Sequence, residues 1–320
     1  MSHFDEYRGR LAPSPTGYLH LGHAKTFWTA QERARQNGGE LILRNEDLDR
    51  ARCKPEFVAA MYEDLRWFGF SWSEGPDIGG SFAPYDQSKR MNFYSDALEK
   101  LRAGNFIYPC TCSRRDIQAA ASAPHAEDDE PIYPGTCRPK GGDPGELSEP
   151  PRGFGRHKTL ESGRGLPHSK TLSRLPAHLP VSWPQCAGVF GKVSLRFHVP
   201  DGETISFHDE NLGEQKFIAG KHFGDFVVWR PDNVPAYQLA CVADDAAMQI
   251  TEVVRGADLL VSTARQILLY RALNLKPPAF FHCGLLRDEA GRRLAKRHDV
   301  LSLRKLREQG RGPEELRKSW

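Results

Sequence analysis

The segment at residues 10–23, RLAPSPTGYLHLGH, constrains the fold more than any other part of the sequence. Pro13 and Pro15 keep the chain out of a helix, whereas an amphipathic segment begins at Gly22 and stops at the Asn-Gly-Gly sequence of residues 37–39. This pattern predicts a strand that turns directly into a helix, with the HLGH sequence at the helix N-terminus.

A helix N-terminus of this kind is suited to bind phosphate. Its unpaired backbone N–H groups and the positive end of the helix dipole attract anions, and Gly22 has no Cβ to keep a ligand away. His20 and His23 can each donate an N–H to phosphate oxygens. The alternative is that both histidines only satisfy the turn by hydrogen bonding, and the four residues HLGH alone do not separate the two interpretations.

The longer string resembles the first signature of class I aminoacyl-tRNA synthetases, and its APSPTG part resembles the glutamate subgroup. The second signature of this family is a lysine-bearing loop for the ATP phosphates. Residues 288–299, DEAGRRLAKRHD, resemble that loop in the form RLAKR, although by itself such a basic run is more often a solvated surface loop. The resemblance implies ATP contacts from Arg293 and Lys296, while Ala295 replaces the usual serine.

Strand-like and helical segments alternate along residues 8–105, and strand-like segments resume from residue 192. This βαβα order predicts an α/β fold with a doubly wound parallel sheet that binds ligands at the carboxyl ends of its strands. We expect residues 1–105 to form the first half of a Rossmann-like catalytic domain, and residues 192–320 to form its second half with a short helical tail. Residues 106–191 are expected to form a small inserted zinc-binding subdomain of acceptor type.

Residues 139–190, within that insertion, are rich in proline, glycine, serine, arginine and histidine and lack sustained apolar periodicity. We interpret them as a long loop or a partly disordered insertion. Their basic side chains could contact tRNA phosphates, although a solvated spacer is the simpler interpretation.

The resemblance also assigns an amino-acid site. Residues 43–50, LRNEDLDR, are similar to a family block in which the carboxylate at Glu46 faces the substrate ammonium group. Arg10 would bind a carboxylate through a forked pair of hydrogen bonds. Tyr237 and Arg255 occupy positions that contact the amino acid in related proteins, and an acidic substrate would neutralise Arg255. The implied glutamate-binding residues are Arg10, Leu11, Ala12, Pro13, Ser14, Glu46, Tyr237 and Arg255.

The reaction implied is attack of the glutamate carboxylate on the α-phosphorus of ATP, which yields glutamyl-adenylate and pyrophosphate. Positioning and charge stabilisation would supply the rate, with Mg²⁺ on the phosphates and His20, His23 and Lys296 as the candidate catalytic residues. The ATP-binding residues would be His20, Gly22, His23, Arg293 and Lys296. For Arg255, a structural ion pair with Asp244 or Asp245 is the alternative to substrate binding.

Three of the seven cysteines lie close together in the sequence, Cys110 and Cys112 in CTC and Cys137 in YPGTC. Thiolates at such spacing suit tetrahedral Zn²⁺, although reduced core cysteines are an alternative. The cluster resembles the zinc site of the glutamyl-queuosine branch of the family, in which a tyrosine oxygen joins three thiolates. That resemblance implies one structural Zn²⁺ held by Cys110, Cys112, Tyr133 and Cys137, with His125 as a conceivable substitute for Tyr133.

Only 24 of the 320 residues follow Lys296, which is too few for the anticodon-binding domain of ordinary glutamyl-tRNA synthetases. Together with the cysteines and the ITEVVRG sequence at residues 250–256, this favours the glutamyl-queuosine branch. Its members activate glutamate without tRNA and transfer it to the queuosine base at the wobble position of tRNA(Asp). The expected partners are L-glutamate, ATP and tRNA(Asp) carrying queuosine, and we expect a monomer. The alternatives are a truncated glutamyl-tRNA synthetase, a nucleotidyltransferase and a catalytically weak zinc-containing RNA-binding paralogue.

Composition adds little about partners but predicts the compartment. The net charge of +3, from 44 basic and 41 acidic residues, is too small to indicate nucleic-acid binding, although it permits a local basic face. The N-terminus lacks the apolar core of a signal peptide, and no stretch approaches the ~20 apolar residues that cross a bilayer. We therefore expect a cytoplasmic protein without membrane contact, whose cysteines are reduced thiols.

Overall fold

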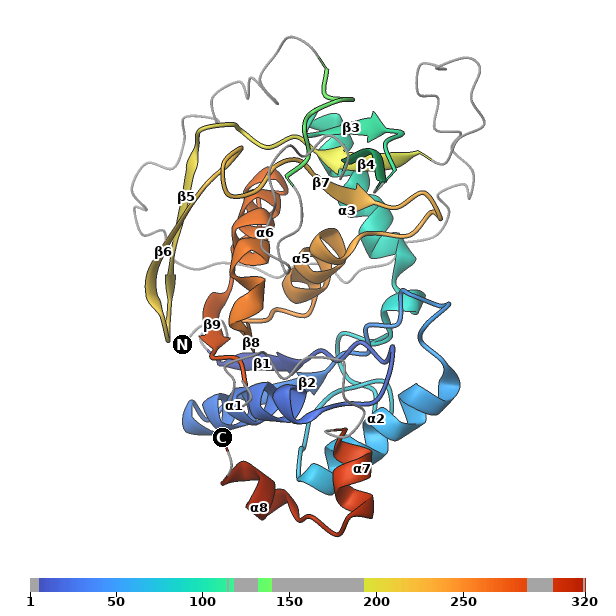
Figure 1. Ribbon diagram of the computed structural model, residues 1–320, viewed down its shortest axis with the longest axis vertical. Coiled ribbons are helices and arrows are strands. Elements are labelled where there is room, and N and C mark those ends of the chain that lie inside the picture. The colour runs from blue at the N-terminus through green and yellow to red at the C-terminus, as the bar shows by residue number, and fades with distance from the viewer. Residues whose placement is uncertain (1–5, 114, 118–131, 140–192, 287–301, 319) are drawn as a thin grey trace, which may run out of the picture.

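The structure is a computed structural model that describes residues 6–113, 115–117, 132–139, 193–286, 302–318 and 320. The N-terminal elements and the C-terminal helices lie together at one end of the molecule, and the cysteine-bearing segment lies at the other end (Figure 1). None of the helices in the described ranges is long and apolar enough to span a membrane.

A parallel sheet forms the base of the molecule, as the alternation of strands and helices predicts. β1 (Arg8–Leu11) and β2 (Glu40–Leu43) are parallel and joined by α1 (Leu21–Gln36), and β8 (Glu252–Gly256) and β9 (Ala279–Cys283) are parallel and joined by α6 (Leu260–Ala272). The two pairs are neighbours, because the N–H of Thr251 donates to the carbonyl of Arg8 at 2.9 Å and the Arg10 guanidinium reaches the carbonyl of Val254. All four strands therefore end at one edge, where the HLGH turn also lies.

Other strands extend this base through one parallel and one antiparallel pairing, and three antiparallel strands form a separate sheet. β5 (Thr204–Asp209) joins β9 and pairs with β6 (Gly213–Ile218), whereas β3 (Ile107–Cys110), β4 (Ser194–Phe197) and β7 (Phe226–Trp229) form a separate sheet. The sheet of β3, β4 and β7 spans the boundary expected at residue 191. Strand β3 precedes that residue, β4 follows it, and the two strands pair. Strands β3, β6, β8 and β9 have no counterpart among the strands expected from the sequence, in which residues 235–275 are expected to be helical or mixed.

Helices pack around the sheets. The remaining helices are α2 (Pro55–Phe68), α3 (Met91–Ala103), α5 (Tyr237–Ala247), α7 (Leu303–Glu308) and α8 (Pro313–Arg317), with 3-10 turns at Gln87–Lys89 and Ala257–Leu259. The apolar residues of α1 recur at helical spacing, so that one face of the helix packs on β1 and β8. The helices α7 and α8 correspond to the expected C-terminal tail and share a hydrophobic cluster with α1 and α2.

Asp64 on α2 is a buried carboxylate that weakens the fold at neutral pH. It has no accessible surface, and neither carboxylate oxygen has a hydrogen-bond partner in the described part of the chain. Burial raises its pKa from 3.8 to about 6, against the opposing effect of Arg307, whose Nη1 lies 3.8 Å away. An acid with a raised pKa favours the folded state below its unfolded value, and this contribution is lost as the pH rises through the folded pKa.

We therefore expect Asp64→Asn to stabilise the protein at pH 7.5. A pKa that rises from 3.8 to about 6 on folding corresponds to at most about 3 kcal/mol, and screening near Arg307 reduces the expected gain to about 1 kcal/mol. Urea denaturation should show that the gain increases between pH 5 and pH 7.5. The exposed neighbour variant Glu63→Gln should change stability little, and an equal gain for Asp64→Asn at both pH values would contradict this assignment.

Candidate active site and thiol cluster

His20 and His23 form the N-terminal cap of α1. The Nδ1 atom of His20 accepts from the backbone N–H of Gly22 at 3.1 Å, and Nδ1 of His23 accepts from the backbone N–H of His20 at 3.3 Å. The rings are stacked with centroids 3.7 Å apart. Because Nδ1 is the acceptor in both rings, the neutral form carries its proton on Nε2. The role in the turn and the role in phosphate binding are compatible, since they use different nitrogen atoms.

Gly22 and residues 302–303, which follow the second motif in the sequence, also contact the N-terminus of α1. A Cβ on Gly22 would lie 3.0 Å from the ring of His20, so glycine allows the ring to sit over the first turn. Ser302 pairs with His20 in an antiparallel bridge, and the N–H of Leu303 donates to the carbonyl of Leu19 at 2.8 Å. Arg293 and Lys296, the expected ATP contacts of the second motif, lie outside the described residues.

The residues expected to hold the substrate backbone meet where β1 and β2 end. The Ser14 hydroxyl donates to Glu46 Oε2 at 3.2 Å. Arg10 lies next to them, with its Nε 3.3 Å from Asp245 Oδ1 and its Nη1 donating to the carbonyl of Val254 at 3.1 Å. The guanidinium fork of Arg10 is thus partly occupied by protein acceptors.

Leu11 and Pro13 contribute backbone geometry to the site, because both side chains are buried. The carbonyl of Leu11 accepts from the N–H of Arg44 at 2.8 Å, and the carbonyl of Pro13 accepts from the N–H of Glu46 at 3.0 Å. These bonds hold the chain after β1 against the chain after β2. Ala12, which lies between them, is partly exposed.

Arg255 is buried with an incomplete set of partners. Only 5 % of its surface is exposed, yet its described partners are neutral groups: Nε donates to His282 Nε2 at 3.3 Å and Nη2 donates to Thr263 Oγ1 at 2.6 Å. The third nitrogen, Nη1, is buried without a hydrogen-bond partner in the described part of the chain. The alternative of a structural ion pair with Asp244 or Asp245 is wrong for this structure, because other arginines bind both aspartates.

Those arginines are Arg44, Arg90 and Arg10. Arg44 Nη1 donates to Asp245 Oδ1 at 2.6 Å, and Arg90 Nε donates to Asp244 Oδ1 at 2.6 Å. Burial raises the pKa of Asp245, but the charges of Arg44 and Arg10 outweigh burial and hold that pKa below its ordinary value. This network is not predicted from the sequence, in which its one signal is the position of Arg44 in the LRNEDLDR block.

Tyr237, the first residue of α5, lies near Arg255, Glu46 and Arg10. It is 40 % exposed, yet desolvation by surrounding protein raises its pKa, and the charges of Arg255, Glu46 and Arg10 also act on it. A side chain that is accessible to solvent and surrounded by protein lies on the wall of a concave site. The structure therefore brings together Arg10, Glu46, Tyr237 and Arg255, which are far apart in the sequence.

The thiols of Cys110, Cys112 and Cys137 converge at the other end of the molecule. Their Sγ atoms all lie within 4.8 Å of one another, with 3.6 Å between Cys112 and Cys137. The Tyr133 hydroxyl lies 3.4 Å from the sulfur of Cys110 and 3.6 Å from that of Cys112. Four ligands around a tetrahedral Zn²⁺ are separated by about 3.8 Å, so this arrangement could hold the metal. His125 lies outside the described residues.

The surroundings of Cys137 favour its thiolate, which is the metal-binding form of cysteine, whereas burial raises the pKa of Cys112. Burial raises the pKa of Cys137, but hydrogen bonds from the Thr111 backbone and the Tyr133 hydroxyl outweigh burial, and the pKa is lowered to about 7. Arg196 adds a positive charge, because its Nε lies 3.2 Å from Cys110 Sγ and its guanidinium lies 4.0 Å from the centroid of the Tyr133 ring.

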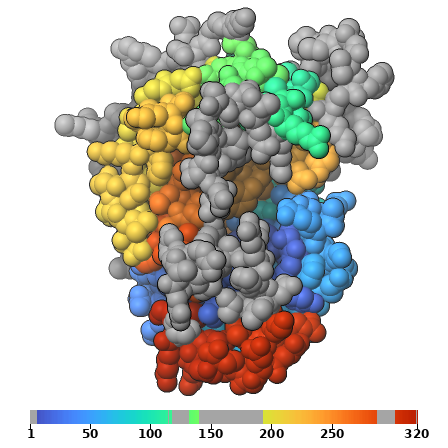
Figure 2. Space-filling view, viewed as in Figure 1, coloured from blue at the N-terminus to red at the C-terminus, as the bar shows by residue number. Residues whose placement is uncertain are grey.

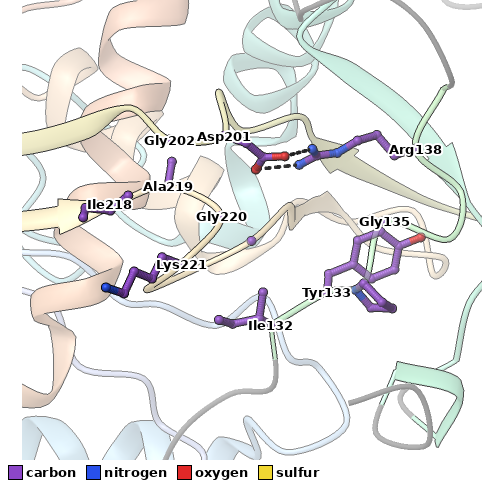
Figure 3. Close-up of a pocket in the computed structure, with 12 residues that line it drawn as sticks. Ile132, Tyr133, Gly135, Arg138, Asp201, Gly202, Ile218, Ala219, Gly220 and Lys221 are labelled. Carbon is purple, nitrogen blue, oxygen red and sulfur yellow. Dashed lines mark hydrogen bonds and ion pairs between the residues drawn. The ribbon is translucent and has the colours of Figure 1, made fainter. Parts of the chain in front are cut away.

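A pocket of about 510 Å³ lies beside the thiol cluster (Figure 3). Tyr133 and Gly135 line it from the cysteine segment, and the turn after β6 lines it with Lys221. An ion pair between Arg138 and Asp201 forms part of its wall. This pocket adjoins the expected zinc site, because Tyr133 belongs to both.

Residues 6–139 and 187–319 match the family model of the catalytic domain of class I tRNA synthetases for glutamate and glutamine (E and Q). The chain belongs to this family. The match confirms the resemblance drawn from the HLGH and RLAKR motifs, and the parallel sheet with its covering helices agrees with a class I synthetase catalytic domain.

Individual relatives of this class I synthetase are also similar over most of the chain. The Glutamyl-Q tRNA(Asp) synthetase of Symbiobacterium thermophilum is 46 % identical, over 96 % of this chain and 83 % of that protein. The protein of the same name from Rhodobacter capsulatus is 39 % identical over 97 % and 98 %. The crystal structure of glutamate-tRNA synthetase from Elizabethkingia anophelis matches with a TM-score of 0.68 and 27 % identity, over 92 % of this chain and 53 % of that one. The chain thus spans about half the length of this solved synthetase.

Proposed function

We propose that this class I synthetase activates L-glutamate with ATP in the absence of tRNA and transfers it to the queuosine base at the wobble position of tRNA(Asp). The observation that supports glutamate is the state of Arg255. Its charge is buried beside neutral groups, and its Nη1 has no partner in the described part of the chain. An unpaired buried charge costs several kcal/mol, which an acidic substrate side chain would offset and a neutral amide would not.

The proposed reaction gives a role to five of the predicted site residues. The glutamate carboxylate attacks the α-phosphorus, and the Nε2–H groups of His20 and His23 stabilise charge on the phosphates as pyrophosphate leaves. Glu46 accepts the substrate ammonium group, and Arg10 and Tyr237 orient the amino acid. Mg²⁺ bound to ATP would neutralise further phosphate charge. No protein nucleophile is needed.

The names and identities of the relatives support a tRNA base as the acceptor. The proteins named Glutamyl-Q tRNA(Asp) synthetase from Symbiobacterium thermophilum and Nitratidesulfovibrio vulgaris are 46 % and 43 % identical to this chain. The proteins named Glutamate--tRNA ligase from Nitrosococcus oceani and Halorhodospira halophila are 38 % and 36 % identical.

The test of this function has two parts. Glutamate-dependent exchange between ATP and pyrophosphate should proceed without tRNA, and labelled glutamate should then be transferred to tRNA(Asp) that contains queuosine. Mild alkali should release the product, as expected of an ester. Equal charging of tRNA(Asp) that lacks queuosine would reject the proposed acceptor, and exchange that requires tRNA would instead favour a truncated glutamyl-tRNA synthetase.

The second motif supplies a prediction about Lys296. This residue is six positions from Ser302, a chain length of at most about 20 Å, and Ser302 pairs with His20. We expect Lys296→Ala to lower the exchange rate roughly a hundredfold by removing a charge from the transition state, with no change in thermal unfolding. Lys305→Ala on α7 is the control and should retain full activity. Unchanged exchange in Lys296→Ala would exclude a role in adenylate formation.

We also propose that Cys110, Cys112, Tyr133 and Cys137 hold one structural Zn²⁺. The purified protein should then contain one zinc per chain, and Cys112→Ser should lose most of it and become less stable, because metal binding contributes to folding. Cys241→Ser, in a buried cysteine outside the cluster, should keep its zinc. Atomic absorption and thermal unfolding measure both effects. A full zinc content in Cys112→Ser would refute the ligand assignment.

A further inference from the structure

The three strands β5, β9 and β8 carry one continuous set of hydrogen bonds across the sheet. Arg255 on β8 and His282 on β9 are directly opposed in the strand register, and Asp209 on β5 joins β9 at its only paired position in the described ladder. His282 Nδ1 lies 2.5 Å from Asp209 Oδ2, and Arg255 Nε donates to His282 Nε2 at 3.3 Å. His282 and Asp209 have no exposed surface.

The carboxylate determines which nitrogen of His282 carries the proton. Asp209 already accepts the backbone N–H groups of Asn211, Leu212 and His282, so it is held as an ionised acceptor. Nδ1 must therefore donate to it, and Nε2 must be the acceptor for Arg255. Burial and the neighbouring charge of Arg255 lower the pKa of His282, which keeps the ring neutral at pH 7. A protonated Nε2 would face the N–H of Arg255 as a second donor.

Thr263 on α6 completes the support of the guanidinium. Its hydroxyl accepts from Arg255 Nη2 at 2.6 Å and lies 2.9 Å from His282 Nε2 and 3.2 Å from the carbonyl of Leu259. Two of the three guanidinium nitrogens are thereby held by neutral acceptors. Nη1 alone is buried without a partner in the described part of the chain, so the support fixes the direction in which this donor points.

We propose that His282, oriented by Asp209, is a positioning residue that fixes Arg255 for the acidic side chain of the amino-acid substrate. This inference rests on the proposed function and extends it, because it names what makes the site selective for an acid. Neutral acceptors orient Arg255 without neutralising it, so its full charge is kept for the substrate. A carboxylate in the place of His282 would pair with Arg255 and compete with glutamate.

The test compares KM for glutamate with KM for ATP in the exchange reaction of the full-length protein. His282→Leu removes the acceptor and should raise KM for glutamate roughly tenfold to a hundredfold, with KM for ATP changed less than twofold. His282→Gln returns a carbonyl acceptor and should recover most of the affinity. Asp209→Asn should resemble His282→Leu, because an amide donor would favour the tautomer with the proton on Nε2. The preference for glutamate over glutamine should fall in parallel.

Cys283→Ala is the matched control. Cys283 follows His282 on the same strand and is equally buried, but it belongs to the cluster packed on α1 on the opposite face of the sheet. This variant should leave both KM values unchanged. If the His282 variants do not fold, Thr263→Val, which removes an acceptor of Arg255 without touching Asp209, should still raise KM for glutamate selectively.

Equal rises of both KM values in the folded variants, or no rise at all, would overturn the positioning role while leaving the proposed function intact. Absence of glutamate-dependent exchange in the wild-type protein would overturn the proposed function and the positioning role together. A glutamate-to-glutamine preference that is unchanged in His282→Leu and in Thr263→Val would also refute the inference.

Discussion

Replacement of Arg255 by methionine is expected to reduce glutamate-dependent pyrophosphate exchange about a thousandfold. The variant removes charge-assisted hydrogen bonds from the guanidinium to the substrate carboxylate, worth about 4 kcal/mol for the two N–H groups of Nη1. Stability should be unchanged or slightly higher, because the variant also removes a buried charge that has no carboxylate partner in the described structure. Exchange kinetics and urea denaturation measure the two effects.

The opposite directions of these effects distinguish a substrate-binding arginine from a structural one. Arg255→Lys should show intermediate exchange, since lysine keeps the charge but lacks the planar fork. Arg230→Met serves as the control, because the described ion pair of Arg230 is a partly exposed one with Asp232. If Arg255→Met kept its exchange activity, or lost activity only in proportion to lost stability, Arg255 would not be the side-chain receptor.

Asp244→Ala is expected to cause the largest loss of stability of any single change considered. Asp244 has no accessible surface, and it accepts from Arg90 Nε at 2.6 Å, Gln87 Nε2 at 2.8 Å and the Tyr94 hydroxyl at 2.9 Å, while Arg44 Nε lies 3.8 Å away. Its removal leaves two buried arginines short of negative charge. The free energy of unfolding should fall by about 3–5 kcal/mol.

The control for Asp244 is a carboxylate that also faces an arginine but lies at the surface. Asp232→Ala breaks a 2.6 Å ion pair with Arg230, and its effect should stay below about 1 kcal/mol because water screens the pair. Urea denaturation of both variants gives the comparison. A loss of less than 1 kcal/mol in Asp244→Ala would show that the buried network does not depend on this carboxylate.

Local sequence signals predicted the parts of the site that depend on a single turn or a short spacing. Pro13, Pro15 and Gly22 define the turn into α1, so the histidine cap could be placed before any contact was known. The spacing of CTC and YPGTC likewise indicated a thiol cluster, and the structure brings those sulfur atoms together. The short strands β6 and β9 carried no strong period and were not expected, because they form through pairing with distant strands.

The sequence by itself determined the family, the α/β class, the turn into the histidine-capped helix and the residues of the thiol cluster. Only the tertiary structure decided how the buried charges are paired. Asp244 and Asp245 were candidates for Arg255, yet they bind Arg90, Arg44 and Arg10, which leaves Arg255 to neutral acceptors. The physical reason is that the partner of a buried charge is the group that sheet register and helix packing bring within hydrogen-bond distance. His282, for example, is 27 residues from Arg255 and 73 residues from Asp209 in the sequence. Separations of that length leave no periodic signal along the chain.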